Sequence, residues 1–216
     1  DWVLIARAVR ELVEVDGVRN VMVFHGTDTA SYTAAALSFL LADLEATVVV
    51  TASNIPAGEP GSDAHKNVGD ALLAARWLTN GVYLSFAGAP DEPSLVHLGT
   101  AVRGKKVDWQ AFDSPNVGPI ATIEDGEIEL VRSWPRRRPR KFKTAVDPNV
   151  LLVHLHPGID LEMMADAVIS SGKRGVVVYV YPCGTATSMS GKSSFPTFVK
   201  RCRDAGIVVA AAVERF

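Results

Sequence analysis

Apolar and polar residues recur along the chain with two different periods. Between residues 2 and 15 the apolar side chains follow helical spacing, and Gly17 comes after them as a stop signal. The same spacing predicts further helices at residues 30–42, 63–80, 160–171 and 196–205. Short apolar runs rich in β-branched residues predict buried strands at residues 19–24, 46–51, 82–86, 149–156, 175–181 and 206–213. Buried strands that alternate with helices predict an α/β protein whose parallel sheet is covered on both faces.

Two further segments divide this α/β pattern. Asp125-Gly126 stands between two alternating runs and predicts a β-hairpin. Residues 134–143 then carry six basic residues, two prolines and no acidic residue, which is typical of a linker, with a nucleic-acid-binding patch as the alternative. The sequence therefore predicts domains at residues 1–133 and 149–216, joined by a basic linker at residues 134–148.

Composition narrows the class of protein. With 48% hydrophobic and 21% charged residues and a net charge of −2, the chain has the composition of a globular protein, and no apolar run approaches the roughly 20 residues of a membrane helix. Cys183 and Cys202 form neither a disulfide framework nor a C-x-x-C pair, so we expect a cytoplasmic protein with no membrane partner. Because the chain starts at Asp1 without Met and ends on an apolar run, we expect it to be part of a longer protein.

Candidate chemistry is concentrated at residues 25–29, His-Gly-Thr-Asp-Thr, where a predicted strand gives way to a predicted helix. Ligands bind at such junctions in open α/β sheets, and a helix N-terminus favours negative charge. The hydroxyl of Thr27 beside the carboxylate of Asp28 could activate a nucleophile for acyl transfer if a nearby lysine had a lowered pKa. Gly26 would let a ligand approach the backbone closely. Alternatively, Thr27 caps the helix and Asp28 stabilises its first turn.

The stretch at residues 25–39, HGTDTASYTAAALSF, resembles the bacterial-type L-asparaginase family, and especially its cytosolic type I branch. The similarity continues in order along the chain, at residues 48–56, 62–72, 111–116, 157–158 and 175–178. The resemblance implies a Rossmann-like, parallel-sheet N-terminal domain and a smaller, flavodoxin-like α/β C-terminal domain, each of them incomplete here. It also implies hydrolysis of L-asparagine to L-aspartate and ammonia, without a metal or an organic cofactor, by a homo-oligomer.

The resemblance assigns roles to individual residues. Thr27 is similar to the second catalytic threonine of the family, and Asp28 pairs with it and contacts the α-amino end of the substrate. Ser53 stands where the family holds the side-chain amide or its attacking water, and Gly26 lies at the α-carboxylate. Lys106 is the preferred match to the catalytic lysine and Lys105 the second, although both could be ordinary surface lysines because this segment is shorter than in the family.

The chain also departs from the family pattern. The family's other threonine lies in a Gly-Gly-Thr-Ile segment that has no match here, so we expect the chain alone to be inactive. Residues 181–191 and 210–215 differ from the usual motifs of the second domain. Two alternative functions therefore stay open: an asparaginase-like subunit of a tRNA-dependent amidotransferase, and a non-catalytic amino-acid sensor. In the first alternative the basic segment could approach tRNA; otherwise a nucleic-acid partner is not expected.

The usual preferences of residue types predict whether several other side chains are buried or exposed. Tyr32, Phe39 and Trp77 lie on predicted helices and are expected in the core, whereas His65 and His97 are expected at the surface.

Overall fold

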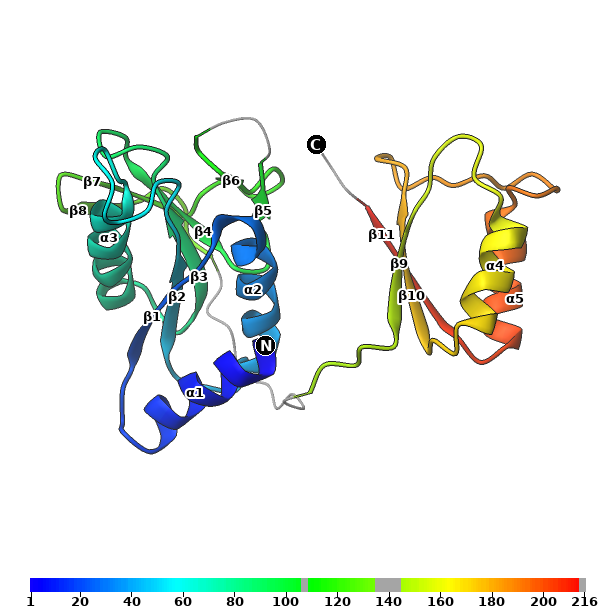
Figure 1. Ribbon diagram of the computed structural model, residues 1–216, viewed down its shortest axis with the longest axis horizontal. Helices are drawn as coiled ribbons and strands as arrows, with labels where there is room; N and C mark the ends of the chain where they lie inside the picture. Colours follow the sequence, from blue (N-terminus) through cyan, green and yellow to red (C-terminus); the bar gives the residue numbers. More distant parts are fainter. Residues whose placement is uncertain (106–108, 135–144, 214–216) are drawn as a thin grey trace. The chain divides into compact units, whose positions relative to one another are not determined.

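The computed structural model describes residues 1–105, 109–134 and 145–213 and divides into two compact units, Asp1–Ala145 and Val146–Phe216 (Figure 1). Each unit is described by itself. The predicted linker at residues 134–148 contains residues 135–144, which lie outside the described part, so its limits stay a prediction. None of the helices among the described residues combines the length and the apolar composition that a membrane span requires.

The first unit is built on a six-stranded mixed sheet with the strand order β1-β2-β3-β4-β7-β8. The strands are β1 (Asn20–Phe24), β2 (Thr47–Thr51), β3 (Gly81–Phe86), β4 (Ser94–Leu98), β7 (Ala121–Glu124) and β8 (Glu127–Leu130). The first three strands pair in parallel, and the last three are antiparallel to their neighbours. A separate two-stranded sheet joins β5 (Arg103–Gly104) to β6 (Phe112–Asp113).

Helices cover both faces of this sheet, as the continuous apolar strands predict. The helices are α1 (Trp2–Glu14), α2 (Thr27–Leu40) and α3 (Ala64–Trp77), and α2 and α3 lie on opposite faces (Figure 1). The side chains of β2 alternate between two apolar clusters: Val48 and Val50 pack on the side of α2, and Val49 packs on the side of α3. All five residues of β2 are consequently buried.

Two features of this unit differ from what the sequence predicts. The side chains of Tyr32, Phe39 and Trp77 are 63%, 53% and 69% exposed, because α2 and α3 pack on the sheet mainly through small residues such as Ala34 and Ala74 and turn their aromatic residues outward. Strands β4, β5 and β6 were not predicted: β5 and β6 have only two residues each, and β4 has no strong apolar pattern of its own. The hairpin prediction is confirmed: Asp125 and Gly126 both have positive φ, 49° and 76°, and connect β7 to β8.

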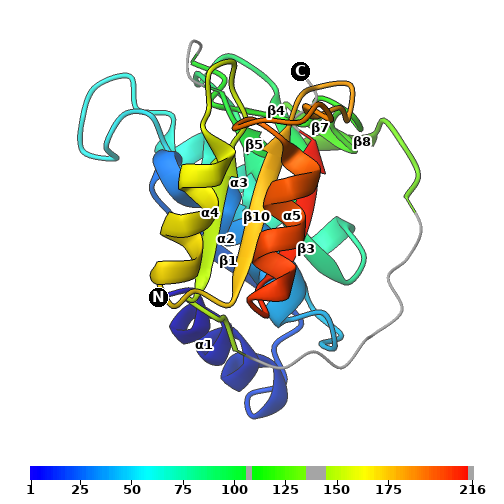
Figure 2. The same cartoon turned by 90° about the vertical axis from the view of Figure 1, so that its right-hand side faces the viewer.

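The second unit is smaller and wholly parallel, with the strand order β11-β10-β9. Its elements are β9 (Val150–His154), α4 (Leu161–Ser170), β10 (Gly175–Val180), α5 (Phe195–Asp204) and β11 (Val208–Val213). Figures 1 and 2 show α4 and α5 side by side on one face of this sheet. The two units together confirm the predicted α/β class, with a larger, Rossmann-like first unit and a smaller second one.

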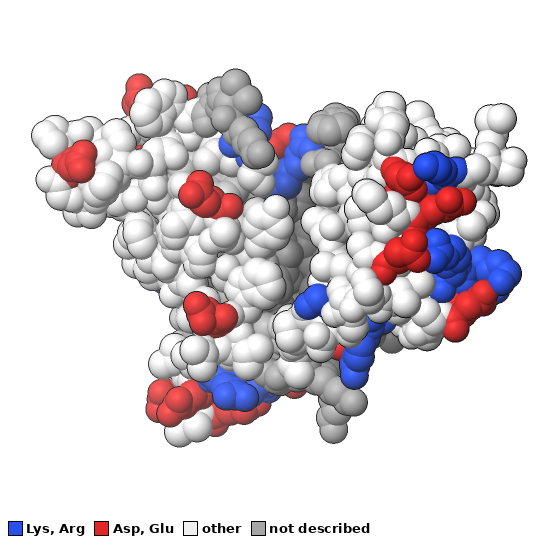
Figure 3. Space-filling model, turned by 45° about the vertical axis from the view of Figure 1, so that its right-hand side comes forward, with Lys and Arg blue, Asp and Glu red and all other residues white. Residues whose placement is uncertain are grey.

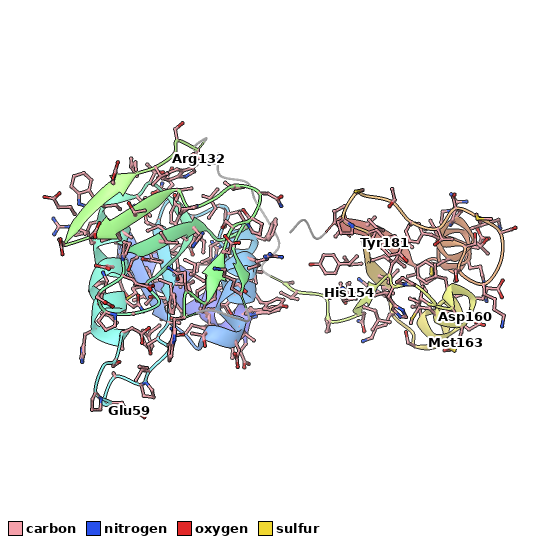
Figure 4. All side chains as sticks on the ribbon, turned by 90° about the horizontal axis from the view of Figure 1, so that it is seen from above. Glu59, Arg132, His154, Asp160, Met163 and Tyr181 are labelled. Atoms are coloured by element: carbon pink, nitrogen blue, oxygen red, sulfur yellow. The ribbon has the colours of Figure 1, made fainter. Side chains whose placement is uncertain are left out.

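The two faces of the small sheet differ in burial. Val153, Val176 and Val178 point to the helices and are at most 7% exposed, whereas Leu152 and Val208 on the other face are 55% and 71% exposed. Figure 4 shows His154 and Tyr181 on the side of the sheet opposite Asp160 and Met163. The helical side carries acidic and basic side chains next to one another (Figure 3), including the ion pairs Lys200–Asp204 and Arg201–Asp166.

Candidate active site

The carboxyl ends of β1, β2 and β3 meet at one edge of the larger sheet, because the three strands run in parallel. Hydrogen bonds tie these ends together. The backbone N–H of His25, just after β1, donates to the carbonyl of Thr51 over 2.8 Å. The hydroxyl of Thr51, at the end of β2, donates to the carbonyl of Ser85 in β3 over 2.8 Å. Residues that follow these strands are therefore held close together at the edge where α/β sheets bind ligands.

Thr27 and Asp28 are the first two residues of α2 and lie at this edge. Gly26 is the N-cap, with an extended backbone (φ −77°, ψ 145°), and the helix N-terminus receives no side-chain cap from it. Thr27 is half-buried and Asp28 is exposed. The alternative in which Thr27 caps the helix is wrong, because α2 starts three residues earlier than predicted and Thr27 lies inside it. The hydroxyl of Thr27 therefore does not serve as the helix cap.

His25 is fixed by two contacts and orients the start of α2. Its Nδ1 lies 2.9 Å from the carbonyl of Gly26, and its Nε2 lies 3.0 Å from the hydroxyl of Thr33. The indole N–H of Trp2 donates to the same hydroxyl over 3.0 Å. A neutral imidazole with its proton on Nδ1 satisfies all three contacts, since Nε2 then accepts from Thr33. Hydrogen bonds to the Thr33 hydroxyl of α2 thus link Trp2 of α1 with His25, just before the start of α2.

Ser53 lies in the turn after β2, and a buried carboxylate holds that turn. Asp63 is 1% exposed. Its two oxygens accept from the backbone N–H of Asn54 over 2.9 and 3.0 Å, and one of them also accepts from the N–H of Ile55 over 3.0 Å. Hydrogen bonds to a buried carboxylate are strong, so the backbone next to the half-buried Ser53 has little freedom.

Asn67 extends this network to the end of β3. Its side-chain nitrogen donates to Asp63 over 2.9 Å and to the carbonyl of Ala87 over 3.2 Å, while its side-chain oxygen accepts from the N–H of Ala87 over 2.7 Å. Asn67 is completely buried. Both residues fall within residues 62–72, one of the stretches that carry the family resemblance, but their hydrogen-bonding partners could not be read from the sequence.

The structure describes only one of the two candidate lysines. Lys106, the preferred match, lies outside the described residues. Lys105 is exposed and follows β5, and its backbone N–H donates to the carbonyl of Ala111 over 2.7 Å. The segment from Trp109 onward is attached to the same sheet edge, because the side-chain nitrogen of Asn54 donates to the carbonyl of Trp109 over 2.7 Å.

The burial of His97 corrects another expectation. His97 in β4 is 1% exposed rather than at the surface, and its Nδ1 lies 3.0 Å from the hydroxyl of Ser114, which is also 1% exposed. Its Nε2 has no hydrogen-bond partner among the described residues. Burial, partly opposed by the carboxylate of Asp113, lowers the pKa of His97 from 6.5 to about 4. The ring is therefore neutral at physiological pH.

The described residues contain no group of three or more His, Cys, Asp or Glu side chains that could hold a metal ion. What the edge does offer is a hydroxyl, a carboxylate and the N-terminus of α2. Helix N-termini bind anionic groups through their unpaired N–H groups and their dipole. The arrangement is suited to binding a small carboxylate ligand and presenting a hydroxyl to it.

Comparison with known proteins agrees with this chemistry. The family model "Asparaginase, N-terminal" matches residues 1–136. An L-asparaginase of Thermococcus kodakarensis is 37% identical over 188 residues, covering 85% of this chain and 54% of its own length. A glutamyl-tRNA(Gln) amidotransferase subunit of Pyrococcus abyssi is 33% identical over 214 residues, covering 96% of this chain and 47% of its own length. The chain thus spans about half the length of these curated relatives.

Solved structures give the same result. The thermostable L-asparaginase of Thermococcus kodakarensis matches with a TM-score of 0.83 at 33% identity, covering 99% of this chain and 62% of that one. L-asparaginase I of Vibrio cholerae matches with a TM-score of 0.80 at 26% identity, covering 99% of this chain and 63% of that one. These findings confirm the resemblance, and the chain belongs to the asparaginase family.

Proposed function

We propose that the protein containing this chain hydrolyses the side-chain amide of L-asparagine to L-aspartate and ammonia. The observation that carries the proposal is the position of Thr27, whose hydroxyl stands at the start of an uncapped helix on the ligand-binding edge of the sheet. The L-asparaginase relative, 37% identical over 85% of the chain, supports the same activity.

The start of α2 accounts for substrate binding in this proposal. A Cβ added to Gly26 would have no atom within 4 Å, so there is open space beside its backbone for the α-carboxylate of the substrate. The unpaired N–H groups of the first helical turn favour that negative charge. Asp28, exposed in the same turn, contacts the α-amino group. Ser53, two residues after the end of β2, faces the side-chain amide or the attacking water.

Thr27 and Asp28 contribute to the chemistry together with a lysine. A threonine hydroxyl is a weak nucleophile or proton donor unless a base activates it, and a carboxylate alone is a weak base. An amine from Lys106, or from Lys105, would complete the group that removes the proton. N–H donors near the reacting carbonyl would stabilise the oxyanion of the tetrahedral species. The proposed mechanism requires no metal and no organic cofactor.

The test is ammonia release from L-asparagine by the protein as its gene encodes it. We expect Thr27→Ala to lower kcat by at least about 100-fold, the scale of losing a group that assists proton transfer. Thr100→Ala, at an exposed threonine outside the proposed site, is the matched control and should retain full activity. Full activity of Thr27→Ala would refute the assignment.

A second candidate function follows from the amidotransferase relatives. The glutamyl-tRNA(Gln) amidotransferase relative from Saccharolobus solfataricus is 29% identical and covers 99% of this chain. If the protein were part of such an amidotransferase, ammonia release should depend on a partner protein and on tRNA. Asparagine hydrolysis by the isolated protein, unaffected by added tRNA, would exclude this alternative.

The sensor alternative and the assembly state are tested separately. A sensor should be stabilised against heat by asparagine without turning it over. We propose a cytoplasmic homo-oligomer, in keeping with two cysteines that form no disulfide in the described structure. Sedimentation of the purified protein measures its assembly state.

A further inference from the structure

The side chain of Asn54 joins three segments at the edge of the proposed site. Its Nδ2 donates to the carbonyl of Gly88 over 3.0 Å and to the carbonyl of Trp109 over 2.7 Å. Asn54 follows β2, Gly88 follows β3, and Trp109 leads toward β6. Both hydrogens of one amide group are therefore used to hold two backbone segments that are distant in sequence.

Gly88 provides independent evidence of a close approach at the same place. A Cβ at this position would lie 2.7 Å from the backbone N of Gln110 and 2.7 Å from the carbonyl carbon of Trp109. Such distances cannot be accommodated, because these two atoms belong to the backbone and not to a flexible side chain. The absence of a side chain at Gly88 thus lets the Trp109–Gln110 backbone pack directly on the end of β3.

The side chain of Asn54 is not what holds its own turn. The backbone N–H groups of Asn54 and Ile55 both donate to the buried carboxylate of Asp63. Removing the side-chain amide of Asn54 would leave these bonds in place. The turn that carries Ser53 and the attachment of Trp109 are therefore separable by mutation.

The attached segment leads directly to a candidate catalytic lysine. Gly104 of β5 pairs with Phe112 of β6, and the N–H of Lys105 donates to the carbonyl of Ala111. A shift of Trp109 away from the sheet edge would consequently be transmitted to Lys105. A displacement of about 1 Å in a group that takes part in catalysis can lower the rate about 100-fold.

We propose that Asn54 is a positioning residue, whose side-chain amide holds the Trp109–Phe112 segment and the adjoining Lys105 against the edge that carries Thr27 and Ser53. The inference rests on the proposed function, because it gives a use to the lysine of an amide-hydrolysing site. Asn54 acts through the neighbouring backbone and does not itself touch the substrate.

The first test measures backbone amide hydrogen exchange in the protein as its gene encodes it and needs no activity. Asn54→Asp keeps the shape of the side chain but directs a carboxylate oxygen at two carbonyl oxygens, and Asn54→Ala removes the donors. In both variants we expect exchange in β5 and β6 to accelerate about tenfold, the scale of one lost hydrogen bond, while the amides of Asn54 and Ile55 keep their protection. Asn54→Gln, which retains the donors, should restore part of the protection.

Asn80→Ala is the matched control, because Asn80 is an exposed asparagine at the opposite, amino end of β3. It should leave exchange in β5 and β6 unchanged. Unchanged exchange in β5 and β6 of Asn54→Asp would overturn the proposal. So would acceleration of equal size throughout the first unit, since that would mean general destabilisation.

The second test separates positioning from substrate binding in the protein as its gene encodes it. Because Gly26 and Asp28 belong to the start of α2 and not to the attached segment, Asn54→Asp should lower kcat for asparagine about 10–100-fold with less than a twofold change in KM. Asn54→Gln should recover part of kcat. An unchanged kcat, or a loss confined to KM, would overturn the positioning role.

The two tests distinguish failure of this inference from failure of the proposed function. If the unaltered protein releases no ammonia from asparagine, the proposed function fails, and the positioning role fails with it, even though the exchange result would still show the structural attachment. If the unaltered protein is active and Asn54→Asp is equally active, the proposed function stands and the positioning role fails.

Discussion

The helices of the two units begin in different ways. In the second unit, the side chain of Asp160 accepts from the N–H of Met163 at the start of α4, and the side chain of Ser194 accepts from the N–H of Thr197 at the start of α5. In the first unit, α2 follows Gly26, which has no side chain. Helix α3 follows Asp63, whose side chain makes no cap.

The comparison of Asp63 with Asp160 shows what the difference means. Both are N-cap aspartates, but Asp160 has an extended backbone that turns its carboxylate onto its own helix, whereas Asp63 has a helical backbone and its carboxylate holds the turn at Asn54. A cap contributes about 1 kcal/mol of local stability. The first unit gives up this local gain at the edge where we place the active site, and uses the same side chain to position backbone. Departures from local rules are expected where structure serves function.

The largest effect that would test this comparison is expected for Asp63→Ala. The substitution leaves the partly buried backbone N–H groups of Asn54 and Ile55 without their acceptor, and it removes one of the two acceptors of the Asn67 amide. We expect the free energy of unfolding of the first unit to fall by roughly 3–5 kcal/mol, because three residues lose hydrogen bonds to a buried carboxylate. All four tryptophans of this chain lie before residue 146, so within the chain tryptophan fluorescence in urea reports on the first unit.

The exposed Asp91, which precedes no helix, provides the control: Asp91→Ala should change stability by less than about 0.5 kcal/mol. A cost of only about 1 kcal/mol for Asp63→Ala would mean that Asp63 acts as an ordinary cap, and the contrast between the units would disappear.

Acid should also affect the units unequally. His97 of the first unit is buried with its pKa lowered to about 4, whereas His154 and His156 of the second unit are exposed. In the unfolded chain His97 takes up a proton near pH 6.5, but in the folded unit only near pH 4. Stability from this source is therefore complete above pH 6.5 and is lost as the pH falls to 4, by about 3 kcal/mol.

Urea unfolding of the first unit at about pH 7, 5.5 and 4.5, which covers most of the interval between the two pKa values, measures this loss. His97→Asn keeps a polar side chain beside Ser114 but does not titrate, so it should flatten the pH dependence that remains after other groups are subtracted. An identical pH dependence in the variant and the unaltered protein would show that His97 does not titrate as its burial predicts.

A smaller effect is expected for Asp160→Ala in the second unit. The variant loses one cap of α4, and we expect a cost of about 1 kcal/mol. Hydrogen exchange of α4 measures it, because this unit contains no tryptophan. Asp166→Ala, within α4 but away from its first turn, is the control and should cost less. A loss as large as that of Asp63→Ala would remove the difference between the two aspartates.

The pattern of apolar residues predicted the fold well for strands that are buried on both faces and for helices whose first residue is set by a neighbouring cap. The five residues of β2 are buried because helices cover both faces, and Asp160 caps α4, which begins one residue after the predicted start at residue 160. Prediction failed where long-range packing decides. His97 lies in an antiparallel strand that has no strong pattern of its own, and Trp77 lies outward because alanines form the contact face of α3.

The position of the candidate site could be predicted from the sequence, but the contacts between its residues could not. Residues 25–29 identified the strand–helix junction and the family, and the start of α2 was placed only three residues too late. The role of Asp63, by contrast, could not be predicted from the sequence. Its position before α3 looks like that of any capping aspartate, and its actual partners, at Asn54 and Ile55, depend on a backbone angle that no local pattern specifies. The lysine assignment stays a prediction, because Lys106 lies outside the described residues.

The smallest change in stability, and the sharpest test of the comparison, is expected for Gly26→Ser. The backbone at Gly26 (φ −77°, ψ 145°) suits a capping serine, and its Cβ would meet no atom within 4 Å. The variant gives α2 the kind of start that α5 has, so stability should rise by a few tenths of a kcal/mol. The new hydroxyl would occupy the N–H groups that we assign to the substrate carboxylate, so KM for asparagine should rise while the stability of the fold increases.

Ser194→Gly, the reverse change in the second unit, should lose a similar amount of stability and leave KM unaltered. A Gly26→Ser variant with unchanged KM would show that the uncapped start of α2 is not where the substrate binds.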